Sequence, residues 1–142
     1  MPTRAAGAVW EGGFKDGKGT YDAESGSLHG SYTRGSRFED QKGSNPEELL
    51  AAAEAACYSM ALSGSLEKNG TPPTKIATSA ACTIEKVGDA FTITRMSLDV
   101  TATVPNIDDA KFQEIALATL TGCPVSRAFK GNMEMKLNAR LG

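Results

Sequence analysis

The residues of this chain best suited to chemistry are two of its three cysteines, Cys57 and Cys123. Cys57 lies in the middle of an alanine-rich segment, residues 49–66, in which Glu54 is the only charged residue. A thiol in such a helix is either inert filling or a protected reaction centre. An arginine within about 4 Å contributes about 4 kcal/mol at an effective dielectric constant of about 20, which offsets the cost of burying a thiolate. Cys57 is therefore predicted to be reactive if an arginine reaches it.

Cys123 differs from Cys57 in its expected place in a helix. Pro124 follows it, and a Cys-Pro pair is typical of the cap and the first position of a helix. We expect a short helix here that ends near Lys130. A thiolate at a helix N-terminus gains about 0.3–1 kcal/mol from the helix dipole. The alternative is that Cys123 is a plain cap. The smaller electrostatic gain favours Cys57 as the nucleophile and Cys123 as the second thiol.

The length and charge of the chain limit the classes of protein to which it can belong. The 142 residues fit a single domain, 1–142, and 15 Lys and Arg against 17 Asp and Glu provide no excess positive charge for a nucleic-acid partner. The first residues lack the apolar run of a signal peptide, and Glu54 with several serines makes 49–66 a poor membrane segment. We therefore expect a cytoplasmic protein with reduced thiols. With His29 as the only histidine and no Cys-x-x-Cys motif, no structural metal is expected.

The longest predicted helix begins at Asn45, a candidate N-cap, with Pro46 in the first position and Glu48 where a capping-box carboxylate stands. It ends at Asn69-Gly70. Roughly 24 residues span about 36 Å, which is long for this chain. Since it has no charged face, we expect the helix to be buried nearly all round, partly by another subunit.

Strand patterns flank this helix. Turn signals divide the first forty residues into an antiparallel meander of Ala6–Glu11, Thr20–Ala23 and Leu28–Thr33, followed by a polar loop over 34–44. A hairpin at Gly88-Asp89 joins two further strands, and a change of apolar phase between Ile93 and Met96 indicates a bulge or a twist.

The remaining elements complete an α+β fold with helices packed against antiparallel sheet. Asp108 or Asp109 caps a helix ending at Gly122, and residues 133–141 alternate as a last strand. Cys82 shares a strand face with Ile76 and Ile84, so it is interpreted as core filling.

Several motifs resemble the family of osmotically inducible OsmC peroxidases. They run in order over nearly the whole chain, and the two cysteine motifs together are quite specific. They are Trp-Glu-Gly (10–12), Gly-Lys-Gly (17–19), Arg-Phe-Glu (37–39), Asn-Pro-Glu-Glu-Leu-Leu (45–50), Ala-Ala-Cys-Tyr-Ser-Met-Ala-Leu (55–62) and Gly-Cys-Pro-Val-Ser (122–126).

The resemblance implies roles for four residues. Cys57 corresponds to the peroxidatic cysteine and Cys123 to the resolving cysteine of that family. Arg37 corresponds to the arginine in the loop before the helix, and Glu47 to its partner carboxylate. The related Ohr proteins carry their arginine nearer the N-terminus, where this chain has only Arg4, so the OsmC branch fits better. The family fold is an intertwined α+β dimer, with antiparallel sheets packed around central, buried cysteine-bearing helices.

The resemblance also implies an activity: a thiol peroxidase that reduces organic hydroperoxides, with hydrogen peroxide as an alternative substrate, in an antioxidant stress response. No metal, flavin or haem is expected, and the reductant would be a small dithiol or a lipoylated protein. A redox-sensing or ligand-binding dimer without turnover is the alternative. A hydrolase is disfavoured because His29 is the only histidine and no Gly-x-Ser-x-Gly motif occurs.

Overall fold

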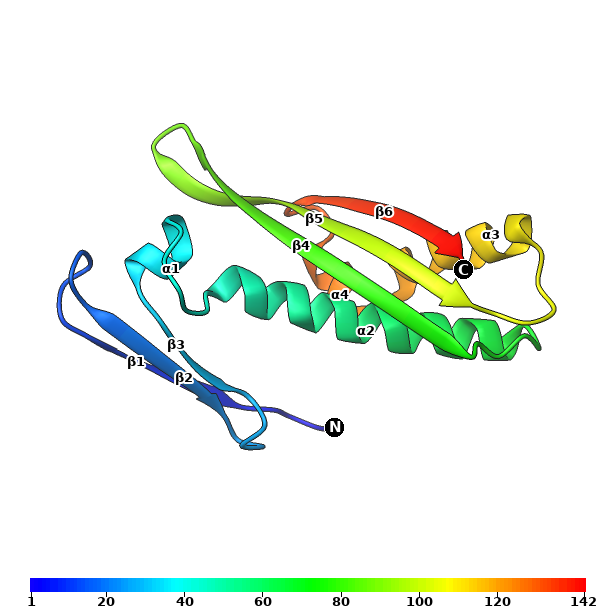
Figure 1. Cartoon of the computed structure of the whole chain (residues 1–142), viewed down its shortest axis with the longest axis horizontal. Coiled ribbons are helices and arrows are strands. Elements are labelled where there is room, and N and C mark those ends of the chain that lie inside the picture. The colour runs from blue at the N-terminus through cyan, green and yellow to red at the C-terminus, as the bar shows by residue number, and fades with distance from the viewer. The chain divides into compact units, whose positions relative to one another are not determined.

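The computed structural model describes all 142 residues, and the chain divides into two compact units, Met1–Glu48 and Leu49–Gly142. Helix α2, Pro46–Lys68, contains the boundary between them. The elements of each unit can be followed in Figure 1. That the chain acts as a single domain stays a prediction.

The N-terminal unit is built on three short strands, β1 (Ala6–Glu11), β2 (Lys18–Ala23) and β3 (His29–Tyr32). They pair antiparallel in the order β1-β2-β3, which confirms the predicted meander. Aromatic rings stabilise the sheet: the centroids of Trp10 and Tyr32 lie 5.5 Å apart, and those of Tyr21 and Tyr32 6.2 Å apart.

The segment predicted as a polar loop is partly helical, so that prediction is wrong for residues 34–38. Helix α1, Arg34–Phe38, begins at Thr33, whose side chain accepts a hydrogen bond from the Ser36 backbone. The Ser36 hydroxyl in turn accepts from the Thr33 N–H at 2.9 Å. This capping box stabilises a single turn that hydrophobic periodicity is too short to reveal.

Both ends of α2 are as predicted. The Asn45 side chain accepts from the Glu48 N–H at 2.9 Å, which makes Asn45 the N-cap. The Glu48 carboxylate accepts a hydrogen bond from the Ser44 hydroxyl at 3.0 Å and not from the Asn45 N–H, so the capping-box role predicted for Glu48 is wrong. The helix ends after Lys68, and Gly70 adopts φ 80° where its N–H donates to the Glu67 carbonyl.

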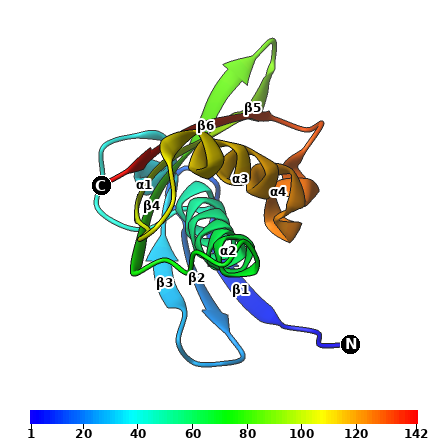
Figure 2. The same ribbon diagram turned by 90° about the vertical axis from the view of Figure 1, so that its right-hand side faces the viewer.

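Within this chain α2 has one buried face, and the cover of its other side by another subunit stays a prediction. Tyr58, Leu62 and Leu66 are fully buried. On the opposite side Ala56 is exposed and Met60 is 80% exposed. Within the C-terminal unit, the sheet and the other helices lie against one side of α2 (Figure 2).

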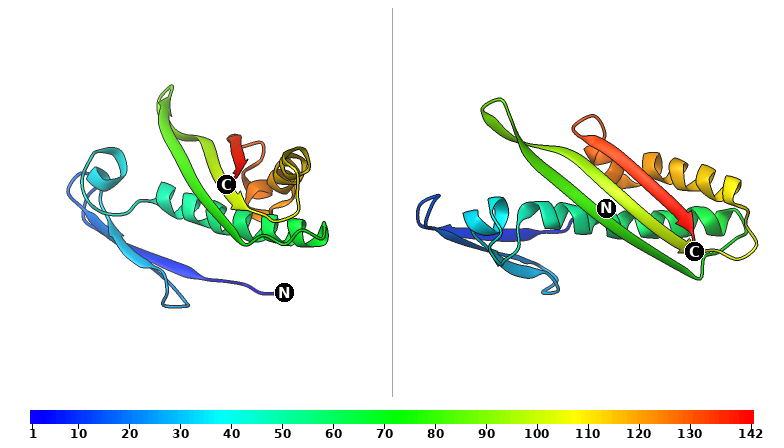
Figure 3. Two further views of the ribbon diagram at one scale, coloured as in Figure 1. Left: turned by 45° about the vertical axis from the view of Figure 1, so that its right-hand side comes forward. Right: turned by 45° about the horizontal axis from the view of Figure 1, so that its top comes forward.

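The C-terminal sheet contains β4 (Lys75–Val87), β5 (Ala90–Thr103) and β6 (Glu134–Leu141), in the order β4-β5-β6. β4 and β5 are antiparallel, and Figure 3 shows their long hairpin extending beyond β6. The predicted bulge is confirmed: Thr83 pairs with Arg95 and Ile84 with Ile93, which leaves Thr94 as the extra residue.

β6 runs parallel to β5, so the prediction of purely antiparallel sheet is wrong for this pair. Between the two strands lie α3 (Asp109–Gly122) and α4 (Pro124–Phe129). These helices return the chain to the end of the sheet where β5 entered it, as crossover connections between parallel strands do. The Asp108 side chain caps α3 by accepting from the Lys111 N–H at 2.8 Å.

The core of the C-terminal unit lies between one face of its sheet and the helices (Figure 2). α2 and α3 pack against the sheet face formed mainly by β5 and β6. Their buried side chains are those of Tyr58, Leu62, Leu66, Leu98, Val100, Ala102, Phe112, Ala116 and Ala139. Cys82 on β4 is half-buried. α2 is also the one helix long and apolar enough to span a bilayer by length and composition, a test that core helices of soluble proteins pass as well.

Candidate active site

Cys57 and Cys123, 66 residues apart in sequence, lie together in the C-terminal unit. Cys57 is half-buried in the middle of α2, and Cys123 is fully buried as the N-cap of α4. The Cys123 thiol donates to Cys57 Sγ across 2.8 Å. The chain turns sharply at Cys123, between the end of α3 and Pro124, and this turn directs the thiol toward α2. A small movement would bring the sulfur atoms to the bonding distance of a disulfide.

The surroundings of Cys57 disfavour a thiolate. Burial raises the pKa of Cys57, and the neighbouring Cys123 thiol and the charge of Glu54 raise it further. The backbone N–H of Val125, in the first turn of α4, donates to the sulfur and lowers the pKa by a smaller amount. Since no cation contributes to this balance, the C-terminal unit alone keeps Cys57 protonated at neutral pH.

Two residues that the sequence analysis did not assign complete the cluster around the thiols. Glu54 is fully buried, one turn before Cys57, and its Oε1 accepts a hydrogen bond from the hydroxyl of Ser126. Ser126 is itself buried one turn after Cys123 on α4. The sequence contains one signal for this cluster: Glu54 and Cys57 are three residues apart, and so are Cys123 and Ser126. A spacing of three places the two members of each pair on the same side of their helix.

The N-terminal unit holds the other predicted pair, Arg37 and Glu47. Arg37 Nη2 donates to Glu47 Oε1 at 2.8 Å, and Arg37 Nε donates to Oε1 and Oε2 at 3.2 and 3.3 Å. The Glu47 side chain is 7% exposed and that of Arg37 33%. This paired contact fixes the plane of the guanidinium group while leaving part of it accessible.

The connection between α1 and α2 holds this pair in place. The Ser36 hydroxyl donates to the Ser44 carbonyl at 2.8 Å, and Asn45 Nδ2 donates to the Ser36 carbonyl at 3.2 Å. Arg37 lies in the last turn of α1 and Glu47 in the first turn of α2, so these bonds set the separation of their side chains. Arg34, at the start of α1, is 39% exposed and pairs with Glu39.

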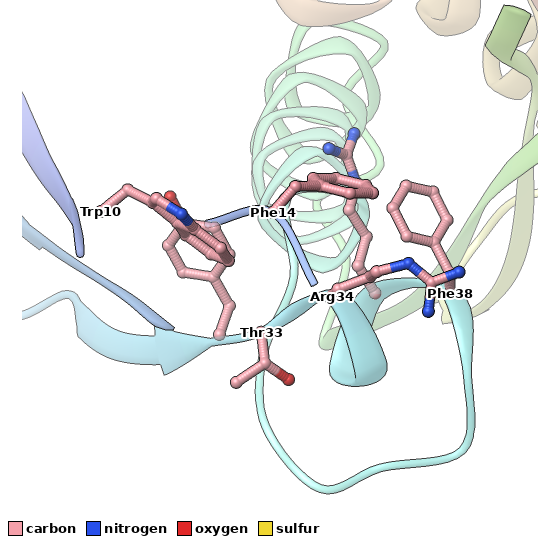
Figure 4. A pocket seen from close by; sticks show the side chains of 7 residues that line it. Trp10, Phe14, Thr33, Arg34 and Phe38 are labelled. Atoms are coloured by element: carbon pink, nitrogen blue, oxygen red, sulfur yellow. The ribbon is translucent and has the colours of Figure 1, made fainter. Parts of the chain in front are cut away.

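A cavity of about 320 Å³ opens beside Arg37 in the same unit. Its walls are mostly aromatic, and the Arg37 guanidinium carbon lies 5.1 Å from the centre of the Phe38 ring. Figure 4 shows the side chains that line it, which are those of Trp10, Phe14, Tyr32, Thr33, Arg34, Arg37 and Phe38. The cavity combines an apolar surface with a fixed cation.

The four predicted site residues thus form two pairs, one in each unit. Along α2, Glu47 and Cys57 are ten residues apart, or about 15 Å of helix rise. No group of three or more His, Cys, Asp and Glu side chains that could hold a metal ion occurs in the chain.

The fold and the apposed thiols define a class of α+β proteins with a two-cysteine centre, one thiol in a long helix and the other at the cap of a short one. The chain belongs to the OsmC family: the family described as OsmC-like protein matches residues 39–138. The chain is 46% identical over 129 residues to Peroxiredoxin OsmC of Escherichia coli, covering 90% of each chain. It is also 31% identical to the organic hydroperoxide resistance protein OhrB of Bacillus subtilis over 72% of this chain and 74% of OhrB.

Solved structures share the fold. The crystal structure of Bacillus subtilis OhrB superposes with a TM-score of 0.75 at 26% identity, covering 96% of this chain and 98% of that one. An OsmC-like protein from Mycoplasma pneumoniae gives a TM-score of 0.77 at 16% identity, covering 99% and 97%. The fold class predicted from the sequence is therefore confirmed.

Proposed function

We propose that this protein is a thiol-dependent peroxidase that reduces organic hydroperoxides, with Cys57 as the peroxidatic and Cys123 as the resolving cysteine. The observation that carries the proposal is the 2.8 Å approach of the two sulfur atoms, one in a half-buried and one in a fully buried position. The names of the relatives, peroxiredoxin and organic hydroperoxide resistance protein, support the same reaction.

The chemistry proceeds in two steps. The Cys57 thiolate attacks the terminal oxygen of the hydroperoxide, the O–O bond breaks, and Cys57 becomes a sulfenic acid. The departing alkoxide takes up a proton equivalent to the one lost when the thiol ionised, and it leaves as the alcohol. Cys123 then condenses with the sulfenic acid to form a disulfide and water. The disulfide protects Cys57 from overoxidation until a dithiol or a lipoylated protein reduces it.

Arg37 supplies the charge that the thiol pair lacks. It stabilises the Cys57 thiolate and donates to the leaving oxygen as negative charge develops there. Glu47 orients the guanidinium group through the paired hydrogen bonds. This role is consistent with the raised pKa of Cys57 in the C-terminal unit alone.

The active site in this proposal is assembled from two subunits of a homodimer. A helix rise of about 15 Å separates Glu47 from Cys57, which is too far for one arginine to bond the carboxylate and contact the sulfur of the same straight helix. The exposed side of α2, with Met60 80% exposed and alanines around it, provides an apolar surface for a second copy. The twofold symmetry gives two sites per dimer. Each site takes its thiols from one chain and the Arg37–Glu47 pair from the other.

The aromatic cavity beside Arg37 favours hydroperoxides with an apolar organic group, since such a group would lie against the ring faces while the peroxide contacts the cation. Hydrogen peroxide is the alternative substrate. The expected location is the cytoplasm, where the thiols start reduced and the reaction belongs to an antioxidant stress response.

The experiment that tests the function is mass spectrometry of the reduced protein before and after one equivalent of cumene hydroperoxide. We expect loss of the Cys57 and Cys123 thiols and formation of a disulfide between them, with Cys82 unchanged. A steady-state assay with a dithiol reductant then separates an enzyme from the alternative, a redox-sensing dimer: the sensor would oxidise once and not turn over. Cys57 left reduced by the hydroperoxide would contradict both.

A further inference from the structure

Glu54 is a buried acid beside two thiols, and the peroxidase mechanism above does not use it. It is fully buried, and its Oε2 has no hydrogen-bond partner, while Oε1 accepts from the Ser126 hydroxyl. An unpartnered carboxylate oxygen in an apolar interior costs free energy, and an alanine or leucine would pack there without that cost. A hydrogen bond to Ser126 alone therefore does not account for a carboxyl group at this position.

The placement of Glu54 relates it to both sulfur atoms. Glu54 and Cys57 are three residues apart on α2, so their side chains are neighbours on one helix face. Ser126, which bonds Glu54, lies one turn after Cys123, and the two sulfur atoms are 2.8 Å apart. The cluster is closed by two contacts between the helices, Cys57–Cys123 and Glu54–Ser126.

The electrostatics of the cluster favour a single negative charge. The charge of Glu54 raises the pKa of Cys57, and the charges of Cys123 and Glu54 both raise that of Tyr58. Burial raises the pKa of Glu54 itself, and the Ser126 hydroxyl lowers it by a smaller amount. These are the titratable groups that face Glu54; the Tyr58 hydroxyl already donates to the Ala116 carbonyl at 2.8 Å. A carboxyl group and a thiol that oppose each other's ionisation titrate as a coupled pair and not independently.

We propose that Glu54 transfers the proton in disulfide formation, its Oε2 carrying the proton of the Cys123 thiol to the hydroxide that leaves Cys57. In this step Cys123 Sγ bonds to Cys57 Sγ, the S–O bond of the sulfenic acid breaks, and its electron pair departs with the hydroxide. Glu54 delivers its own proton to the hydroxide, and its Oε2 takes up the proton of Cys123, so that water forms and Glu54 returns to its starting state. The hydroperoxide has already supplied the oxidation, so no other oxidant is needed.

This proposal rests on the peroxidase function and concerns only its second step. Positioned acid–base groups accelerate proton transfers about 10²–10⁴-fold. Replacing Glu54 should therefore slow disulfide formation and change the attack on the hydroperoxide much less. The Cys57 sulfenic acid should then accumulate.

The test follows the two steps separately in the full-length protein. Reduced protein is mixed with one equivalent of cumene hydroperoxide and quenched at set times with dimedone and an alkylating reagent. Mass spectrometry then gives sulfenic acid, disulfide and free thiol at several pH values. For Glu54→Gln we expect disulfide formation slowed by about 100-fold and loss of the pH dependence that the wild type shows in this step. Glu54→Asp should restore part of the rate. Glu67→Gln, the same change at an exposed position of α2, is the matched control.

The outcomes distinguish this inference from the peroxidase proposal. A wild type that forms neither sulfenic acid nor the Cys57–Cys123 disulfide would overturn both, whereas a Glu54→Gln variant with wild-type disulfide rate and pH profile would overturn only the role of Glu54. If Glu54→Gln does not fold, Ser126→Ala removes the bond that holds Oε1. We then expect about 10-fold slower disulfide formation, partly restored in Ser126→Thr, and an unchanged rate would contradict the proposal.

Discussion

The two units of this chain treat charge in opposite ways. In the C-terminal unit, the thiols and Glu54 lie in an apolar interior that opposes ionisation and raises the pKa of Cys57. In the N-terminal unit, Arg37 and Glu47 form a salt bridge beside a partly open cavity. The C-terminal unit holds the two apposed thiols without a cation beside them, and the N-terminal unit holds a cation without a thiol. Neither unit alone therefore contains the chemistry proposed for the protein.

The largest expected effect follows from removing the nucleophile. Cys57→Ser should abolish hydroperoxide reduction and leave thermal unfolding nearly unchanged, because serine is close in volume but cannot form a sulfenic acid. A steady-state assay with a dithiol and circular dichroism check the two parts. Cys82→Ala is the matched control and should keep the wild-type rate. Turnover that persists in Cys57→Ser would place the reaction elsewhere.

Removing the second thiol should separate the two steps. Cys123→Ser should allow one rapid oxidation by cumene hydroperoxide, then lose multiple turnover with a dithiol and accumulate sulfinic acid at Cys57. Intact-protein mass spectrometry after increasing equivalents of the hydroperoxide measures this. Normal turnover of the variant would assign the resolving role to another thiol.

Removing the cation tests whether the N-terminal unit activates the thiol of the C-terminal unit. Arg37→Ala should raise the pKa of Cys57 and slow attack on the hydroperoxide by about 100-fold, the usual effect of deleting one donor to a developing oxyanion. Arg37→Lys should restore only part of the rate, because lysine provides charge without the planar pair of donors.

Thiol titration by pH-dependent alkylation measures the Cys57 pKa in each of these variants. Arg4→Ala serves as the control, since Arg4 is the arginine nearest the N-terminus. The same Cys57 pKa in wild type and Arg37→Ala would remove the argument for activation.

Mixing two inactive variants tests whether the pairs meet across a dimer. Cys57→Ser and Arg37→Ala chains are combined under conditions that exchange subunits. If each site takes its thiols from one chain and its arginine from the other, each heterodimer has one intact site, and random exchange should recover about a quarter of wild-type activity. Proven heterodimers that remain inactive would show that each site is built within one chain.

The sequence predicted the elements of this fold where local signals are strong. The Asn45 cap, the Gly70 end of α2 and the bulge opposite Thr83 and Ile84 are all confirmed. These features depend on the order of a few neighbouring residues, which a sequence displays directly.

Other features depend on pairings between distant segments. The parallel alignment of β6 with β5 is decided by how α3 and α4 cross the sheet, and alternation of residue types is the same in parallel and antiparallel strands. The cluster of Glu54 with Ser126 joins residues 72 positions apart in sequence. The spacing of three residues relates Glu54 to Cys57 and Ser126 to Cys123, but only the packing of the two helices reveals the contact between Glu54 and Ser126.

The smallest expected effect concerns the stability contributed by Glu54. Burial raises the pKa of Glu54 from its ordinary value of 4.5. Below that pH the carboxyl group is protonated in both the folded and the unfolded chain. As the pH rises above it, the unfolded chain loses the proton first, which favours unfolding, so the stabilising contribution is lost progressively up to the folded-state pKa.

Glutamine carries no proton to lose, so Glu54→Gln should escape this decline. Urea unfolding of reduced wild type and variant between pH 4 and 8 measures the difference in the free energy of unfolding, which should shift in favour of the variant by about 1 kcal/mol as the pH rises. The unpaired amide of glutamine costs the same at every pH and cancels in the comparison. Glu67→Gln should show no such trend. A shift in favour of the wild type would mean that Glu54 is ionised in the folded chain and stabilised by a partner. The C-terminal unit would then not differ from the N-terminal unit by an interior that opposes ionisation.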